Sequence, residues 1–312
     1  MVRGDIILEK SGGTPKRPVG IMAFYDSDEL ALCSNFNQVL RFDEDRILSR
    51  FAFHQLRWLK DRNAFERFTR KTTGLQNLQM KKLIELKLHV PQIEAQTMIA
   101  DTLDKIVDNQ RTLQREIIDL DSLVKSRFVE MFEKCDVRVP LGKVCRFKSG
   151  KTLPKDKEMP SGDFLYAKVG DLNLPGNEMT IRFSRTYVDA ATAKNCLIPK
   201  GSVVFPKRGG AIGTNKKRIT SEDCCLDLNL MSVIPGGKIC TEYLLAWIEQ
   251  MDLTDIANGS TVPQINNKDL DPLIIPLPKM ELQQEFAVFT RKVDKSRFVD
   301  GGDEVGEFLL SR

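Results

Sequence analysis

The residues best suited to bind a charged ligand gather in one short segment, residues 207–218. Six of its twelve residues are Lys, Arg or Asn, and it also holds Gly209, Gly210 and Gly213. Lys and Arg supply positive charge for phosphate groups, and glycine lets a backbone approach a phosphate closely. The segment therefore favours contact with nucleic acid. The alternative is an ordinary glycine turn with solvated lysines.

A weaker copy of this segment lies near the N-terminus. The ten residues from Gly4, GDIILEKSGG, align with the ten from Gly201, GSVVFPKRGG, so a strand leads into a basic glycine loop twice. Which side chains would read bases and which would hold phosphate is not assigned by the pattern. The candidate DNA-binding residues are Lys10, Lys16 and Arg17 in the first copy and Lys168, Lys207, Arg208, Gly209, Gly210, Lys216, Lys217 and Arg218 in the second.

The sequence carries no pattern typical of catalysis, metal binding or a cofactor. The run GGAIGTNK from Gly209 is not a phosphate-binding P-loop, because no Lys comes directly after its last glycine. The two histidines, His54 and His89, lie far apart, and the seven cysteines include no Cys-x-x-Cys. We therefore predict reduced thiols, no catalytic residue, no metal and no cofactor held by this chain. Tyr166 and Trp247 are expected in the core rather than stacked on bases.

The composition predicts a folded protein with a hydrophobic core and a charged, water-soluble surface. Hydrophobic residues make up 41% and charged residues 29% of the 312 residues, and the formal net charge is +4. The length allows two domains and a connector. No apolar run approaches the ~20 residues of a membrane span, and the first residues do not form a signal peptide. We predict a cytoplasmic protein with no membrane partner.

A long helix must position the charged segments. Residues 91–132 contain no Gly or Pro after the first residue, and apolar residues recur at steps of three and four. Such a helix is roughly 60 Å long at ~1.5 Å per residue. The alternative is an amphipathic helix packed on its own domain. The predicted coiled-coil seam consists of Ile99, Leu103, Ile106, Leu113, Ile117, Leu120 and Val124.

A second repeat defines the domain organisation. The fourteen residues from Leu83, LIELKLHVPQIEAQ, align with those from Leu270, LDPLIIPLPKMELQ, so that a strand, a proline and a Glu-x-Gln precede a helix in both copies. We expect an α+β fold with two β-rich domains separated by a long coiled-coil helix, and further helices over 51–70, 241–251 and 281–298. The predicted divisions are 1–90, 91–134, 135–278, 279–298 and a disordered tail, 299–312.

This arrangement resembles the specificity (S) subunit of type I restriction–modification systems. The resemblance rests on the two strand-to-glycine-loop segments, the stretch YAKVGDL from Tyr166, and the proline-ended strand before each helix. It covers the chain up to about residue 298. Against that pattern the front of the first domain and the second helix are short, so we expect a chain truncated at both ends.

The resemblance implies a function carried out with other subunits. Each β-rich domain would be a target-recognition domain for half of a split site in double-stranded DNA, and the helices would space the domains. The helices would also dock methyltransferase (M) subunits, which direct adenine methylation, while restriction (R) subunits would complete the complex. S-adenosylmethionine, ATP and Mg would be bound by those partners. A second S fragment or another copy of the chain is a further expected partner.

Two other interpretations remain open at this stage. A protein-interaction scaffold, with two β-rich domains on a coiled-coil stalk and no role in DNA binding, agrees with the small net charge. A non-functional fragment agrees with the short front of the first domain. Clustered positive charge and salt-sensitive DNA affinity would distinguish a DNA-binding protein from both.

Overall fold

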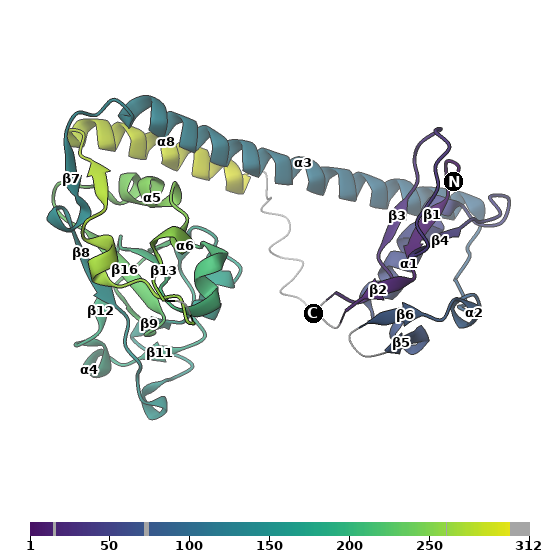
Figure 1. The fold of residues 1–312 in the computed structure, drawn as a ribbon, viewed down its shortest axis with the longest axis horizontal. Coiled ribbons are helices and arrows are strands. Elements are labelled where there is room, and N and C mark those ends of the chain that lie inside the picture. Colours follow the sequence, from purple (N-terminus) through teal and green to yellow (C-terminus); the bar gives the residue numbers. More distant parts are fainter. Residues whose placement is uncertain (15–16, 72–74, 260, 300–312) are drawn as a thin grey trace. The chain divides into compact units, whose positions relative to one another are not determined.

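The computed structural model describes residues 1–14, 17–71, 75–259 and 261–299. The chain forms two compact units, Met1–Arg115 and Glu116–Arg312, and both mix helices with sheets (Figure 1). One continuous helix, α3 (Ile93–Phe132), contributes its first part to the first unit and its last part to the second. The predicted tail lies outside the described residues except for Val299, which ends a helix.

The first unit contains two three-stranded sheets, ordered β3-β1-β4 and β2-β6-β5. Helix α1 lies between the first sheet and the start of α3 (Figure 1), and its apolar side chains Phe51, Ala52 and Leu56 are buried with Ile6 and Leu8 of β1. The elements are β1 (Ile6–Glu9), β2 (Ser11–Gly13), β3 (Met22–Phe24), β4 (Asn37–Leu40), α1 (Ser49–Asp61), η1 (Glu66–Phe68), β5 (Thr69–Lys71), β6 (Gln76–Leu78) and α2 (Met80–Leu83).

After the end of α3, the second unit continues with a strand, a short 3-10 turn and a second strand. Its main sheet has the order β10-β14-β13-β16-β8, and a smaller sheet has the order β11-β9-β15-β12. The first half holds β7 (Arg138–Pro140), η2 (Leu141–Lys143), β8 (Cys145–Ser149), η3 (Lys155–Lys157), β9 (Phe164–Ala167), η4 (Val169–Asn173), β10 (Thr180–Ile181), β11 (Tyr187–Val188), α4 (Ala190–Ala193) and β12 (Leu197–Ile198).

The second half of this unit carries the glycine segment and the last helix. Its elements are β13 (Val203–Pro206), η5 (Gly209–Thr214), β14 (Arg218–Thr220), β15 (Cys224–Leu226), β16 (Leu230–Pro235), α5 (Thr241–Glu249), α6 (Leu253–Ile256), α7 (Asn267–Leu270), β17 (Ile274–Pro276) and α8 (Met280–Val299). The predicted helices over 241–251 and 281–298 are confirmed as α5 and α8. The helix expected over 51–70 ends at Asp61, because Asn63 adopts a left-handed conformation (φ 60°) that stops a helix.

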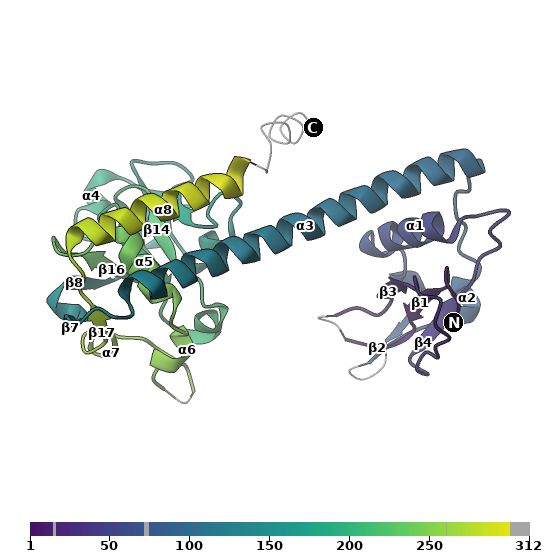
Figure 2. The ribbon, with the colours of Figure 1, turned by 90° about the horizontal axis from the view of Figure 1, so that it is seen from above.

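Four aromatic rings join the last helices of the second unit. Phe128 and Phe132 of α3 contact Tyr243 of α5 and Phe286 of α8, with ring centroids 4.8–5.6 Å apart. Both views show α8 running alongside the end of α3 (Figures 1 and 2). Buried aromatic pairs of this kind stabilise packing beyond the area they bury. This cluster fixes the end of α3 to the second unit.

The Glu-x-Gln repeat ends in a buried glutamine that performs the same task in both units. Gln96 accepts a hydrogen bond from the Leu48 amide (2.8 Å) and donates to the Arg46 and Pro91 carbonyls. Gln283 makes the same three bonds, to the Cys240 amide (3.0 Å) and the Lys238 and Pro278 carbonyls. Both side chains are fully buried. Each glutamine therefore caps a helix, α1 or α5, and joins it to the next long helix.

The predicted seam of α3 is not the face by which the helix packs on the two units. Buried positions on α3 are Gln96, Ala100, Phe128 and Phe132, which lie off the predicted seam. Exposure reaches 48% at Ile106 and 45% at Ile117. Leu103, Leu120 and Val124 are half-buried, and Val124 packs against the core of the second unit. Each end of the helix thus packs on its own unit, and most of the seam is left facing solvent.

The seven cysteines are free thiols, as the sequence predicts. Cys145, Cys196, Cys224 and Cys225 are buried, and burial raises the pKa of Cys145 and Cys224 to about 12. Buried thiols of high pKa are poor nucleophiles. In the part of the chain that the structure describes, no helix is long and apolar enough to cross a membrane.

Candidate nucleic-acid interface

The glycine segment forms an open loop on the second unit. It leaves β13 at Pro206, passes through the 3-10 turn η5 and reaches β14 at Arg218. Gly209 has a φ of +70°, which favours glycine at this position. A Cβ added at Gly210 or Gly213 would meet nothing within 4 Å. Packing inside the chain does not require glycine at these two positions, so their backbone is open to an incoming molecule.

Three of the predicted cations point into the domain rather than out of it. The Lys217 side chain is fully buried, and its ammonium donates to Asn215 Oδ1 (2.9 Å) and the Met251 carbonyl (2.8 Å). Arg218 donates to the Lys217 carbonyl at 2.7 Å. Lys207 is buried and donates to Ser149 Oγ at 2.9 Å. Burial lowers the pKa of all three groups.

The prediction that Lys217 faces a phosphate is therefore wrong for this arrangement. Its ammonium holds the C-terminal end of the loop to the carbonyl before α6, and Asn215 in turn accepts a hydrogen bond from the Leu253 amide at 3.0 Å. A count of charges along the segment could not distinguish this buried lysine from the exposed Arg208. Burial depends on the path of the loop, which doubles back at Asn215 (φ 53°).

Two predicted cations remain on the outer surface of the loop. Arg208 is exposed, and its guanidinium has no hydrogen bond or ion pair with any residue that the structure describes. Lys216 is half-buried and donates to Asn173 Oδ1. Lys168 is paired with Glu158 (2.6 Å) and lies over the ring of Tyr166. Arg208 is thus the cation most open to a phosphate, and its role in DNA binding stays a prediction.

Two further loops lie against the glycine segment and enlarge the surface. The turn η4 is held to it by the Lys216–Asn173 contact, and it carries Gly170, where an added Cβ would also meet open space. On the other side Gln264 forms an isolated bridge with Arg208, and the Gly209 amide donates to the Pro263 carbonyl at 2.8 Å. Amide side chains can pair with base edges or phosphate oxygens.

Sequence reasoning missed Gly170 and Asn173 as part of this surface. The signal available was the stretch YAKVGDL itself, which places a glycine after a strand just as the segment at Gly209 does. Tyr166 is buried, with its hydroxyl donating to the Lys151 carbonyl at 2.8 Å, so the interpretation as a core residue is confirmed. Trp247 likewise packs against the core.

The corresponding loop of the first unit is closed. Gly13 lies in β2, which pairs with β6, and a Cβ there would meet the Val19 amide nitrogen at 2.4 Å. Lys10 is half-buried, and Arg17 is exposed with its guanidinium 3.9 Å from Glu9. Lys16 lies outside the described residues. Lys10 and Arg17 thus belong to one segment, whose described residues do not present the open glycine backbone of the second unit.

No group of three or more His, Cys, Asp or Glu residues suited to a metal ion occurs among the described residues. The surface around Arg208 consists of a guanidinium with no partner in the described part of the chain, open glycine backbone and side-chain amides. Such groups bind anions and base edges, and they provide neither a nucleophile nor a general base. The arrangement can bind a polyanion.

The family comparison agrees with this fold and surface. Residues 3–120 and 137–298 match the type I restriction modification DNA specificity domain, which covers most of the chain in two copies. The chain therefore belongs to the family of type I restriction–modification specificity subunits. Its α+β fold, with two such domains and the long helix α3 between them in the sequence, is the one predicted.

Individual relatives have low sequence identity to this chain but match about half of it or more. A Methanocaldococcus jannaschii protein with a provisional name as the type I restriction enzyme MjaX specificity subunit is 23% identical, over 94% of this chain and 72% of its own length. The type I restriction enzyme MjaIX specificity subunit of the same organism is 26% identical over 53% of this chain and 41% of its own length.

Solved structures share the fold. The type I restriction-modification S subunit from M. genitalium gives a TM-score of 0.64 at 15% identity, covering 99% of this chain and 81% of that one. A chain from a structure that describes complex assembly and conformational transition of the type I R-M system gives 0.55 at 18% identity, with 99% and 80% coverage.

Proposed function

We propose that this chain reads double-stranded DNA for a type I restriction–modification complex, and that the surface around Arg208 is one of its DNA-contacting regions. The observation that carries the proposal is the open glycine backbone at Gly210 and Gly213 beside an exposed guanidinium that has no partner among the described residues. Phosphates would bind the guanidinium and backbone amides, and neighbouring amide side chains would reach base edges.

In this proposal methylation and restriction are performed by M and R subunits, with this chain supplying sequence specificity. Those subunits would hold S-adenosylmethionine, ATP and Mg, so the chain itself needs neither a cofactor nor a metal. The exposed apolar residues of α3 support a docking role, since Leu113 is 38% and Ile117 45% exposed on a helix with no Gly or Pro. They would form the helix face on which M subunits bind.

Salt dependence of DNA binding tests the contact surface. Arg208→Ala should weaken binding of a random-sequence duplex and reduce the slope of log K against log salt by about 1, because one phosphate contact is lost. Lys238→Ala is the matched control: it also removes one positive charge from the second unit, but at an exposed position beyond the end of β16 that lies away from the loop, and it should leave the slope unchanged. Equal slopes for wild type and both variants would place DNA elsewhere on the chain.

Function within the complex is tested with the methyltransferase subunit encoded beside this chain. The two proteins together should methylate adenine in one defined sequence, detected by sequencing modified DNA. Leu113→Asp with Ile117→Asp should remove co-purification of the methyltransferase while leaving DNA binding by this chain intact. A complex that forms but leaves all DNA unmethylated would contradict the specificity role and favour a protein-interaction scaffold.

A further inference from the structure

In the second unit a strand–turn–strand segment closes one side of the domain. Strand β8 pairs antiparallel with β16, with Phe147 opposite Val233, and β7 pairs antiparallel with β17. Between them the turn η2 buries Leu141 completely, and its amide donates to the Leu273 carbonyl at 2.7 Å. This segment, residues 137–149, therefore adds an outer strand to the sheet and also buries an apolar side chain in the core.

The first unit repeats the framework that this segment covers. Its sheet β3-β1-β4 corresponds to β14-β13-β16, because Ile6 pairs with Leu40 on one side as Val203 pairs with Val233. The buried glutamines and the helices that they cap correspond as well. Among the described residues β4 is an edge strand, whereas its counterpart β16 has β8 on its outer side.

A second element of the first unit also lacks its partner strand. The repeat aligns Leu86 with Leu273 and Leu88 with Ile275, which belongs to strand β17 in the second unit. Residues 86–90 nevertheless form no strand. A strand assignment requires hydrogen bonds to a neighbour, and the neighbour of β17 is β7. Strand β4, whose outer edge has no neighbouring strand among the described residues, and residues 86–90 are thus the counterparts of the two strands that residues 137–149 join, β16 and β17.

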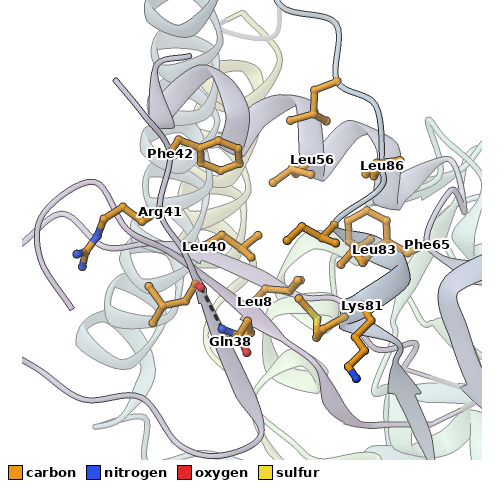
Figure 3. Close-up of a pocket in the computed structure, with 14 residues that line it drawn as sticks. Leu8, Gln38, Leu40, Arg41, Phe42, Leu56, Phe65, Lys81, Leu83 and Leu86 are labelled. Atoms are coloured by element: carbon orange, nitrogen blue, oxygen red, sulfur yellow. Dashed lines mark hydrogen bonds between the residues drawn. The ribbon is translucent and has the colours of Figure 1, made fainter. Parts of the chain in front are cut away.

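An apolar groove lies between β4 and residues 86–90. Its volume is about 660 Å³, and Figure 3 shows its lining, to which β4 and the segment after it contribute Leu40 and Phe42 and the opposite wall contributes Leu83 and Leu86. Exposure confirms that the groove is open. Val233 and Ile275 are fully buried in the second unit, whereas Leu40 and Leu88 at the equivalent positions are only half-buried.

We propose that this groove binds a strand–turn–strand segment of a second polypeptide, with the sequence pattern of residues 137–149. Its first strand would pair with residues 86–90, and its second would add antiparallel to β4. A leucine at the turn, equivalent to Leu141, would fill the cavity between Phe42 and Leu86. An apolar residue equivalent to Phe147 would lie opposite Leu40.

The partner is a polypeptide other than a copy of this chain. Each copy already uses its own residues 137–149 in its second unit, where β7, the turn and β8 are paired and Leu141 is buried. Releasing them to fill the groove of another copy would open one domain for each domain closed. The first residues of the chain do not fill the groove either, since the Met1 ammonium donates to the Ala31 carbonyl at 2.5 Å.

A synthetic peptide of residues 137–150 with Cys145→Ser, added to the 312-residue chain, tests this proposal. Hydrogen exchange of the amides in residues 37–42 and 86–90 should slow saturably with peptide concentration. The same peptide with Leu141→Asp should bind at least about tenfold more weakly, because burial of one leucine contributes ~1.5–3 kcal/mol and 1.4 kcal/mol corresponds to tenfold. The protein is unchanged in this comparison, so misfolding cannot explain the difference.

A variant of the groove sharpens the assignment. Leu88→Asp in the chain should abolish peptide binding, with native exchange in β1 and α1 showing that the unit is still folded. Slowed exchange only in residues 230–235 would mean that the peptide enters the second unit and would overturn the proposal. Slowed exchange of residues 37–42 on raising the chain concentration without peptide would overturn it in favour of a second copy, and unchanged exchange at saturating peptide would overturn it altogether.

Discussion

The two units of this chain share the way a helix is attached to a domain and differ in what closes the domain. Gln96 and Gln283 make the same three hydrogen bonds, and the three-stranded cores pair in the same register. Among the described residues, strands equivalent to β7 and β8 occur in the second unit and not in the first. The comparison separates a framework that recurs in both units from a covering segment that is described in the second unit alone.

The glycine loops differ in the same way. At Gly209 the loop is open, and at Gly12 and Gly13 it is part of a strand that pairs with β6. Glycine at Gly13 is needed because Val19 approaches closely, whereas nothing within the chain requires glycine at Gly210. Similar sequences therefore serve packing in one unit and leave an open surface in the other.

The largest effect is expected where the second unit holds the end of α3. Phe132→Ala should lower the free energy of unfolding by about 3–5 kcal/mol, because it removes a fully buried ring from a cluster with Phe128, Tyr243 and Phe286. Urea denaturation with hydrogen exchange resolved by unit measures it. Val129→Ala, at an exposed position on the same helix, should change stability by less than about 0.5 kcal/mol.

The shared clamp should respond alike in both units. Gln96→Leu and Gln283→Leu keep the side-chain volume but leave a buried amide and two carbonyls unpaired, at a cost of about 2–3 kcal/mol each. Each loss should be confined to its own unit in hydrogen exchange. Costs that differ by more than about 1 kcal/mol would show that the two attachments are not equivalent.

Acid should distinguish the units at one aligned position. The repeat places Asp5 beside Ser202, and Arg41, through its bidentate hydrogen bonds, lowers the pKa of Asp5 to about 2. Because the folded-state pKa lies below the unfolded value near 4, the contribution of Asp5 is complete above pH 4 and is lost as pH falls towards 2. Asp5→Asn should flatten this pH dependence in the first unit only.

The expected size of this effect is limited because Arg41 is 61% exposed to solvent. Ser202 is neutral and donates to the Pro199 carbonyl at 2.6 Å, so the second unit has no titrating group at this position. Tryptophan fluorescence and unit-resolved hydrogen exchange, recorded between pH 2 and pH 5, would measure the acid sensitivity of both units. Equal acid sensitivity of wild type and Asp5→Asn would assign acid unfolding to other carboxylates.

The smallest effect is expected at Arg127, near the end of α3. Arg127 pairs with Glu285 of α8 at 3.3 Å and with Glu130 on its own helix, both at the surface. Arg127→Ala should leave the free energy of unfolding almost unchanged, because exposed ion pairs contribute little. A loss as large as that of Phe132→Ala would mean that the contact of α8 with α3 depends on charge rather than on the aromatic cluster.

Much of the architecture follows from local sequence patterns. Residues 92–132 contain no Gly or Pro, so the sequence predicts α3 almost to the residue, and α5 and α8 follow from their apolar spacing. The duplicated strand-to-glycine and proline-to-helix segments identify two related units and the family. These features are determined by the sequence because backbone conformation and side-chain periodicity act over a few neighbouring residues.

Tertiary structure alone decided which side chains face outward. Lys217 and Arg208 belong to one basic run, yet one is fully buried and the other has no described partner. Gln96 and Gln283 look like surface glutamines until the capped helices are placed beside them, and Phe128 and Phe132 lie off the predicted seam. The reason is physical: burial and pairing depend on segments distant in sequence, which no local pattern of residue types specifies.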